Sequence, residues 1–412
     1  MPPRARHCAP ALALVIALAL AGCGGGTSLL HKSKTTTSTA TVGIPSQDPQ
    51  ALARLGFPML ATKNTTRVDG ADPIADAAAV ALAVYPSAVP GTHPTAVTLA
   101  PTNDWQAAIA ASVLMAPPVK APLLLSGPTA LPAVTSQALS RMAPAGAGQA
   151  SGAQVIRVGS VPSVSGMRTA SVKGSDPYTL AAGIDRLATA IAGTPSSDVV
   201  IASATNPAYA MPAAGWAAES GNPILYVGAS GVPAATAQAL QSHNHPHIYA
   251  LGPPSVIPNA TLTQLARYGT VKRVGAVDPA ANSVAFAIYR DPACASGQAC
   301  AHVPGSFGWA MRSPGHGYVL LNATRPLDAA AAAPLSGSGD YGPQLLVDDP
   351  SSLPKPVLTY FLDYATPGYT AEGPTAAVYN HGWIIGDQNA ISVGVQAEVD
   401  NLLEAVPQSA AK

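Results

Sequence analysis

Residues 204–228 read ATNPAYAMPAAGWAAESGNPILYVG, and the chain carries two altered copies of this phrase. The earlier copy, at 101–127, is PTNDWQAAIAASVLMAPPVKAPLLLSG, and the later copy, at 323–347, is ATRPLDAAAAAPLSGSGDYGPQLLV. Each copy runs from a polar strand end through an alanine-rich segment to a proline and an apolar run. Alanine favours helix, and short continuous apolar runs favour strands that are covered on both faces. The phrase therefore predicts one strand–helix–strand unit that is built three times.

An Asp-Pro pair opens each repeat. The pairs begin at Asp72, Asp176 and Asp278, at nearly equal intervals. An aspartate N-cap accepts hydrogen bonds from the free N–H groups of the first helical turn, and proline suits the next position because it has no N–H. Each pair therefore predicts the start of a helix. In the second repeat, apolar residues then recur at helical spacing as far as Gly193.

Each repeat is expected to contain three short strands separated by helices, in the order helix–strand–helix–strand–helix–strand. The predicted strands are 96–99, 122–125 and 155–159 in the first repeat, 199–201, 223–226 and 248–252 in the second, and 318–321, 343–346 and 383–386 in the third. Strands that alternate with helices predict a parallel sheet with helices on both faces. The sequence thus predicts an α/β protein of three tandem parallel-sheet modules.

The repeats resemble the cell wall-binding repeat 2 family. The resemblance is carried by the capped helix that follows R-x-x-G-x-D at Arg67, by Asp328-Ala329, and by closing strands that end in glycine, as at 155–159. Proteins of that family carry the unit in threes. The resemblance therefore implies three Rossmann/Toprim-like modules in a pseudo-threefold arrangement, and non-covalent attachment to an anionic cell-wall polymer. It covers residues 65–405.

The N-terminus is typical of an exported lipoprotein. Arg4 and Arg6 precede the apolar run 9–20, which has the length of a signal-peptide core and is too short to cross a membrane. The next residues, 20–23, read LAGC and resemble a bacterial lipobox, which implies diacylglycerol on Cys23 and cleavage before it. Two acyl chains suffice for stable membrane anchoring. The alternative is an ordinary cleaved signal in which the cysteine falls by chance.

Five segments are predicted along the chain. They are a signal peptide (1–22), a flexible Ser/Thr/Gly-rich tether (23–64), and three repeats at 65–165, 166–271 and 272–412. The third repeat is the longest because residues 291–317 are inserted before its first strand. In an oxidising compartment Cys294 and Cys300 of this insertion are expected to form a disulfide, and a metal pair is the alternative. We expect the insertion to cover a groove between repeats or to contact a partner.

Composition and motifs narrow the function classes. The chain has 412 residues, of which 48% are apolar, and it carries 21 basic and 21 acidic residues. This balance favours a well-buried globular protein and gives no basic excess for binding nucleic acid. The motifs G-x-S-x-G, H-E-x-x-H and the P-loop are all missing from the sequence. We therefore predict a non-catalytic protein without a metal or cofactor.

The candidate ligand-binding residues lie where the first strand of each repeat ends. They are Thr102, Asn103 and Trp105, then Thr205 and Asn206, then Thr324, Arg325 and Asp328. Open α/β sheets bind ligands at the carboxyl ends of their strands, and the helix N-termini that follow favour anions. The alternative is that Thr and Asn only cap the helices. Trp105 is the best candidate for stacking on a sugar, whereas Trp216 and Trp383 are expected in the core.

Residues 243–247 read HNHPH. Three histidines so close together are able to bind a metal or to sense pH. The proline and the polar neighbours favour a solvated loop between a helix and a strand, and we predict that loop.

The predicted function is non-covalent binding of cell-wall glycan or anionic secondary wall polymer by a lipid-anchored envelope protein. Its partners would be that polymer, or a peptidoglycan-associated glycan, and the membrane. One alternative is the solute-binding lipoprotein of a transporter, which usually has two lobes around a single cleft. Another is an envelope enzyme or its regulator, which would need polar groups with perturbed pKa values in one pocket. The sequence does not indicate an oligomeric state.

Overall fold

Short parallel strands alternate with helices along the chain, as the alternation of apolar runs and alanine-rich segments predicts. A computed structural model describes residues 59–292, 306–338, 342–369 and 377–407, all of which belong to one compact unit. Among these residues, no helix combines the length and the apolar character needed to cross a membrane. Cys23, Cys294 and Cys300 lie outside the described residues.

The strands of the described chain form three main sheets, one for each repeat. In spatial order, the first sheet is β4 (Leu123–Ser126), β3 (Val97–Pro101), β5 (Val155–Val158) and β6 (Thr169–Val172); the second is β8 (Ile224–Val227), β7 (Asp198–Ser203), β9 (His247–Leu251) and β10 (Thr270–Val274); the third is β12 (Gln344–Val347), β11 (Gly317–Asn322), β14 (His381–Ile385), β2 (Thr65–Val68) and β1 (Met59–Ala61). Every pairing in them is parallel except that of β1 with β2. A small separate pair joins β13 (Gly368–Tyr369) to β15 (Val406–Pro407). The predicted class, several parallel-sheet α/β modules, is confirmed.

Each sheet contains a fourth strand that the sequence analysis missed. These strands are β6, β10 and β2, which lie directly before the Asp-Pro pairs, in segments that we interpreted only as helix starts. Their sequences are TASV, TVKRV and TTRV, so none contains a continuous apolar run. In β6 and β10 most residues are partly or fully exposed, because these strands lie at a sheet edge. A further finding is that β1 begins at Met59, within the segment predicted as tether.

The helices follow in the predicted order. They are α2 (Pro73–Val84), α5 (Pro177–Ala192) and α10 (Pro279–Ile288) after the Asp-Pro pairs; α3 (Trp105–Ala111), α6 (Pro207–Ala210), α7 (Pro212–Ser220) and α11 (Pro326–Ser336) after the first strands; and α4 (Ala133–Met142), α8 (Ala234–Ser242) and α12 (Lys355–Tyr360) after the second strands. Two helices were not predicted, α9 (Asn259–Leu265) and α13 (Val393–Leu402). The carboxylates of Asp72, Asp176 and Asp278 accept from first-turn N–H groups of their helices, so the predicted caps are confirmed.

Each Asp-Pro helix crosses from one sheet to the next. Strand β6 completes the first sheet, and α5, which follows it, packs against β8 of the second. In the same way β10 completes the second sheet and α10 packs against β12 of the third. Strand β2 completes the third sheet and α2 packs against β4 of the first. The three repeats are therefore linked in a closed cycle, and the N-terminal strand belongs to the C-terminal sheet.

The helices that follow the first strands pack against one another and join the repeats. Helix α11 contacts α3 and α7, and its residues 328–336 are all buried. Its alanines, 329–333, allow close packing because they carry only a methyl group. Glycine is required at the end of this helix, because a Cβ on Gly337 would lie 2.7 Å from the carbonyl oxygen of Ala218 on α7.

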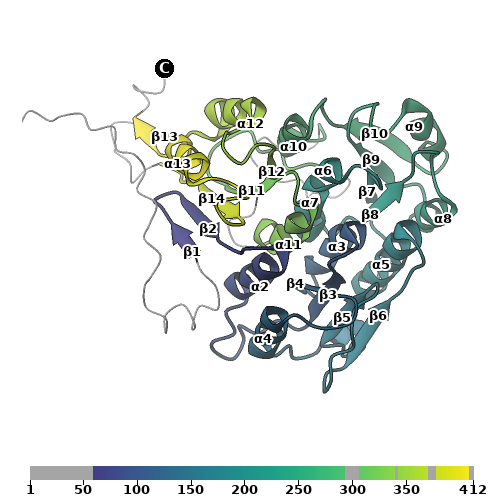
Figure 1. The fold of residues 1–412 in the computed structure, drawn as a ribbon. Coiled ribbons are helices and arrows are strands. Elements are labelled where there is room, and N and C mark those ends of the chain that lie inside the picture. The colour runs from purple at the N-terminus through teal and green to yellow at the C-terminus, as the bar shows by residue number, and fades with distance from the viewer. Residues whose placement is uncertain (1–58, 293–305, 339–341, 370–376, 408–412) are drawn as a thin grey trace, which may run out of the picture. The chain divides into compact units, whose positions relative to one another are not determined.

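The pairing of β2 with β14 closes the cycle (Figure 1). Arg67 of β2 is fully buried, and all its hydrogen-bond acceptors belong to the C-terminal repeat. Its Nε donates to Gln396 Oε1 at 2.8 Å, and its Nη1 donates to the carbonyl oxygens of Gly386 at 2.7 Å and Asp387 at 3.0 Å. In the turn before β2, the backbone N–H of Asn64 donates to the carboxylate of Asp400, on α13, at 2.7 Å. The two ends of the described chain are therefore held together by buried polar contacts.

The insertion of the third repeat is fixed at both flanks. The amide of Asp291 donates to the carbonyl of Phe307 at 2.9 Å, and the Phe307 ring stacks on Tyr249 of β9 with centroids 3.6 Å apart. Lys272 of β10 donates to the Asp291 carboxylate at 2.6 Å. The flanks therefore pack on the second sheet. The residues between them, 293–305, lie outside the described part.

Replacing Arg67 with methionine tests whether its buried hydrogen bonds hold β2 in the third sheet. The variant leaves several buried acceptors without a donor, at a cost of about 1–3 kcal/mol each, so we expect the free energy of unfolding to fall by about 3 kcal/mol or more. Urea denaturation measures the loss. As a control, Arg186→Met on the exposed face of α5 should change stability by less than about 0.5 kcal/mol. Equal stability of the two variants would contradict the closure.

Candidate functional site

The carboxyl ends of the strands form one edge of each sheet, and these three equivalent edges are numbered after their sheets. They are distinct from the lateral edges at which β6 and β10 lie. At each edge the third strand of the repeat ends in a glycine with left-handed backbone: Gly159 (φ 65°), Gly252 (φ 118°) and Gly386 (φ 91°). Glycine adopts this conformation without the steric cost that a Cβ would bring. The edges differ in the side chain that lies over this glycine.

The third edge is covered by Arg325, the N-cap residue of α11. Its Nη1 would lie 3.1 Å from a Cβ on Gly386. Its Nη2 donates to Asp76 of α2 at 2.8 Å, its Nε lies 2.6 Å from Asp328, and its Nη1 lies 4.0 Å from Asp387. Asp76 and Asp328 are fully buried. The charge of Arg325 is therefore neutralised inside the protein rather than presented to a ligand.

Two buried carboxylates share this one guanidinium. Burial and the neighbouring Asp328 together raise the pKa of Asp76 to about 8, against the opposing effect of Arg325. Burial also raises the pKa of Asp328 to about 6, again against Arg325. Since both values lie above that of a free carboxyl group, the folded protein binds protons that the unfolded chain releases between about pH 4 and pH 8. These two groups therefore make the folded state less stable as pH rises through that interval.

Replacing Asp76 with asparagine tests this pH dependence. Asparagine should still accept from the amide of Gly70, because Asn282 accepts from the amide of Ala276 at the equivalent position of α10. We expect the Tm of the wild type to fall between pH 5 and pH 8.5 more steeply than that of Asp76→Asn. Thermal unfolding followed by circular dichroism measures both profiles.

The control is Asp363→Asn, at an exposed position, which should follow the wild-type profile. Superimposable profiles for Asp76→Asn and the wild type would show that Asp76 does not titrate over this range.

The second edge is covered by Val256 and Tyr209. A Cβ on Gly252 would lie 3.2 Å from Val256 Cγ1 and 3.6 Å from Tyr209 Cδ1. The hydroxyl of Tyr209 donates to the carbonyl of Val277 at 2.8 Å. Asn206 is the N-cap residue of α6, but its side chain makes no capping bond and instead donates to Ser203 and Thr205. The predicted residues of this edge, Thr205 and Asn206, are therefore hydrogen-bonded to each other, and the ring of Tyr209 lies over the glycine.

The first edge is open. The atoms nearest to the position of a Cβ on Gly159 are apolar and belong to Leu180, at 3.3 Å, and Pro101, at 3.4 Å. A cavity of about 360 Å³ lies here. It is lined by Pro101, Asn103, Asp104, Gln106, Gly159, Ser160, Gly174, Ser175, Asp176, Pro177 and Leu180. Its size and its mixture of polar and apolar walls suit a small ligand or one unit of a polymer.

The cavity is built by two repeats. Asp104 and Gln106 come from the start of α3, in the first repeat, whereas Ser175 and Asp176 precede α5, in the second. Strand β6 brings the second group into place because it pairs with β5 in the first sheet. The site therefore depends on the exchange of strands between repeats.

The helix N-termini at this edge are already occupied. Asp104 accepts from the amide of Ala107 at 2.9 Å, and Asp176 accepts from the amides of Tyr178 and Thr179, both at 2.9 Å. These hydrogen bonds, together with Ser175, lower the pKa of Asp176, with the bond from Thr179 as the largest cause. The predicted capacity of the helix N-termini to hold an anion is therefore used by the protein's own carboxylates.

The structure brings some predicted site residues together and separates others. Asn103 lines the cavity, but Thr102 does not, and the N-cap of α3 is Asp104 rather than Thr102 or Asn103. Trp105 packs edge-on against Tyr226 of the second repeat, with centroids 5.9 Å apart, and does not line the cavity. Thr324 is exposed and donates to Asn322.

Five residues of these edges were not predicted from the sequence as site residues: Asp76, Asp104, Gln106, Ser160 and Ser175. Asp104 was detectable, since aspartate directly before an alanine-rich helix is a strong N-cap signal. The role of Asp76 was not detectable, because its partner Arg325 is distant in sequence. Trp216 is fully buried, as predicted, whereas Trp383 is only half-buried.

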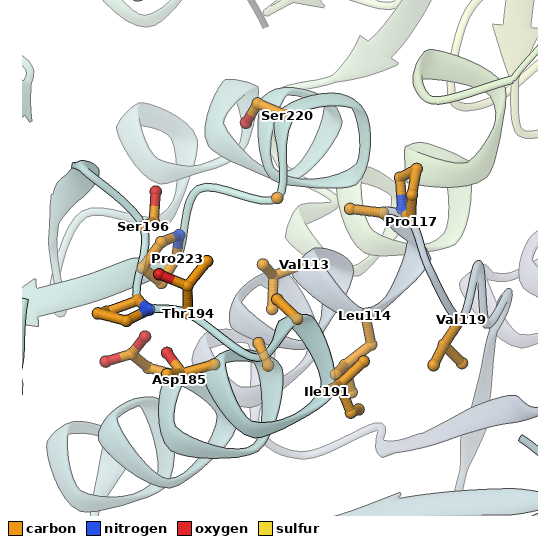
Figure 2. A pocket seen from close by; sticks show the side chains of 16 residues that line it. Val113, Leu114, Pro117, Val119, Asp185, Ile191, Thr194, Ser196, Ser220 and Pro223 are labelled. Carbon is orange, nitrogen blue, oxygen red and sulfur yellow. The ribbon is translucent and has the colours of Figure 1, made fainter. Parts of the chain in front are cut away.

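A second cavity, of about 200 Å³, lies between the first and second repeats. Figure 2 shows Val113, Leu114 and Ile191 gathered on one side of it, with Asp185 and Ser196 on the other. Its walls are largely apolar, and it lies away from the sheet edges. We assign it no ligand.

Asp185 pairs with the first histidine of HNHPH. His243 is buried, and its Nε2 lies 3.0 Å from both carboxylate oxygens of Asp185, while its Nδ1 lies 2.8 Å from the carbonyl oxygen of Ser196. Both partners only accept hydrogen bonds, so the doubly protonated ring satisfies them best. Burial alone would lower the pKa of His243, but the hydrogen bond and charge of Asp185 outweigh it and the pKa is raised. The prediction of a solvated loop is wrong for this residue.

The other histidines of this segment do not join it in a metal site. His247 pairs with a different carboxylate, that of Asp198, at 3.1 Å, and His245 is exposed. Over the described ranges, no three His, Cys, Asp or Glu side chains are grouped so as to hold a metal ion.

Replacing His243 with glutamine tests the buried pair. A raised histidine pKa stabilises the fold below the unfolded value, near pH 6.5, and this contribution is lost as pH rises through the folded value. We expect His243→Gln to lower the free energy of unfolding by about 3–5 kcal/mol at pH 5.5, and by clearly less at pH 9. Urea denaturation at the two pH values measures this, with exposed His245→Gln as the control. An equal loss at both pH values would contradict an ion pair.

The fold defines a modular α/β protein with a cavity at the junction between its first and second repeats. Residues 172–262 match the family model of cell wall binding domain 2 (CWB2). This match confirms the resemblance inferred from the repeats. The matched segment begins at the end of β6 and includes the Gly174–Leu180 wall of the cavity.

Several solved structures share the fold, among them the following two. Cwp8 from Clostridium difficile superimposes with a TM-score of 0.61 at 15% identity, over 82% of this chain and 52% of that one. Cwp6 from Clostridium difficile superimposes with a TM-score of 0.60 at 16% identity, over 84% of this chain and 49% of that one. The chain thus spans about half the length of each. No curated protein matches the sequence.

Proposed function

We propose that this chain is a non-catalytic envelope protein that binds a cell-wall glycan in the cavity at the edge of the first sheet. One observation carries the proposal: an open, mostly polar cavity lies at the carboxyl ends of parallel strands and is partly built by the segment that matches a cell wall binding domain. Its asparagine, glutamine and serine side chains are suited to sugar hydroxyl groups, and its prolines and Leu180 to the apolar face of a sugar ring.

The cavity walls favour binding over catalysis. Their two carboxylates are both engaged as helix caps, and the pKa of Asp176 is lowered rather than moved towards neutrality. The carboxyl groups with strongly raised pKa values, Asp76 and Asp328, are buried beneath Arg325 at another edge. A general acid or base works best with a pKa near the operating pH and with access to substrate.

The transporter alternative fits the architecture less well. A solute-binding lipoprotein would have two lobes around one cleft, whereas the described chain has three main sheets linked in a cycle. Attachment to the membrane remains part of the proposal: diacylglycerol on Cys23 and the tether up to β1 would hold the repeats near the wall. A disulfide between Cys294 and Cys300 would pin the insertion, as expected for an exported protein.

A sedimentation assay tests the proposed function. Full-length protein in detergent is mixed with purified insoluble bacterial cell wall, centrifuged, and measured in the pellet. We expect it to pellet with the wall, and we expect Asn103→Trp, which fills the cavity from an exposed position, to weaken binding at least about tenfold by excluding the ligand.

The control is Gln137→Trp on the exposed face of α4, which should pellet like the wild type. Absence of the wild type from the pellet would refute wall binding. Equal binding of Asn103→Trp and the wild type would place the site elsewhere.

A further inference from the structure

The charges around the cavity indicate which sugars it selects. Its lining residues include two carboxylates, Asp104 and Asp176, and no lysine, arginine or histidine. The remaining polar lining side chains, of Asn103, Gln106, Ser160 and Ser175, are uncharged. An anionic polymer would therefore meet negative charge in this cavity without a compensating cation among the lining residues.

An anion at such an edge is usually bound by backbone N–H groups or by a basic side chain, and in this protein both already have carboxylate partners. Backbone N–H groups at the starts of α3 and α5 donate to Asp104 and Asp176. Arg325, at the equivalent place on the third edge, is paired with Asp76 and Asp328. The protein has thus already satisfied the groups that would attract a phosphate or carboxylate.

Building on the proposed function, we infer that the cavity selects a hydroxyl-rich sugar that carries an ammonium group, of the glucosamine class, rather than an anionic polymer unit. The ammonium would lie between Asp104 and Asp176, each of which has one carboxylate oxygen that makes no capping bond. In Asp176 that oxygen accepts from the hydroxyl of Ser175 at 3.1 Å. The amide and hydroxyl side chains would receive the sugar hydroxyls. Pro101, Pro177 and Leu180 would lie against the ring.

Isothermal titration calorimetry on the full-length protein at pH 6 tests the selectivity. The probes are a glucosamine hexamer, its fully N-acetylated counterpart, poly-glutamate and a lysine-containing peptide of equal charge. We expect the glucosamine hexamer to bind at least about tenfold more tightly than the acetylated hexamer, with an affinity that falls as salt is added. Poly-glutamate and the peptide should bind more weakly still.

Asparagine variants separate charge from capping. Asparagine caps a helix about as well as aspartate, so Asp104→Asn and Asp176→Asn should remain folded yet lose most of the preference for the glucosamine hexamer. Asp278→Asn, the same change at the cap of α10, should keep the preference.

The inference would be overturned by equal or tighter binding of the acetylated hexamer, or by tighter binding of poly-glutamate. Binding of the peptide as tight as that of the sugar would also overturn it. If the wild type pellets with cell wall but none of the soluble probes binds, the glucosamine selectivity is refuted and the proposed function stands. If the glucosamine hexamer binds but the protein does not pellet with wall, the selectivity stands and wall binding is refuted.

Discussion

The buried pairing of β2 with β14 places the N-terminal strand in the C-terminal sheet, and the rest of the architecture follows from it. Each sheet takes its fourth strand from the segment that precedes the next Asp-Pro helix. In the third sheet that strand is β2, which comes from the beginning of the described chain. Arg67 is suited to this role because one guanidinium satisfies several acceptors that the C-terminal repeat leaves unpaired.

The same exchange of strands explains why the sites lie between repeats. At every edge, one wall comes from the start of the helix after the first strand, and the other from the segment that leads to the next Asp-Pro helix. The three equivalent edges have diverged: Arg325 with its carboxylates covers the third, Val256 and Tyr209 cover the second, and the first is open. The three repeats thus share one backbone geometry at these edges, and the differences in side chains leave a cavity at the first of the three edges.

Local signals in the sequence predicted much of the fold. The helix starts at the Asp-Pro pairs were predicted correctly because an N-cap needs only the carboxylate and the backbone of the next turn, as at Asp176. The nine strands inside the repeats were predicted because each is a short, largely apolar run. The edge strands β6 and β10 were missed because a half-exposed strand needs no apolar run, and its pairing partner is set by the tertiary fold.

The candidate site was predictable in position but not in composition. The rule that ligands bind at the carboxyl ends of parallel strands led to Asn103, which lines the cavity. Asp176 was identified only as a cap, because nothing local shows that β6 carries it to the edge of the first sheet. The burial of His243 was equally hidden, since it depends on Asp185 in a different helix.

Hydrogen exchange in the full-length protein tests the closed cycle most directly. Mass spectrometry would follow the amides of residues 65–68 and 381–385 in one time course. If β2 completes the third sheet, both segments exchange slowly and at similar rates, because each protects the other. Exchange of 65–68 at the rate of an unstructured peptide, while 381–385 stays protected, would contradict the closure.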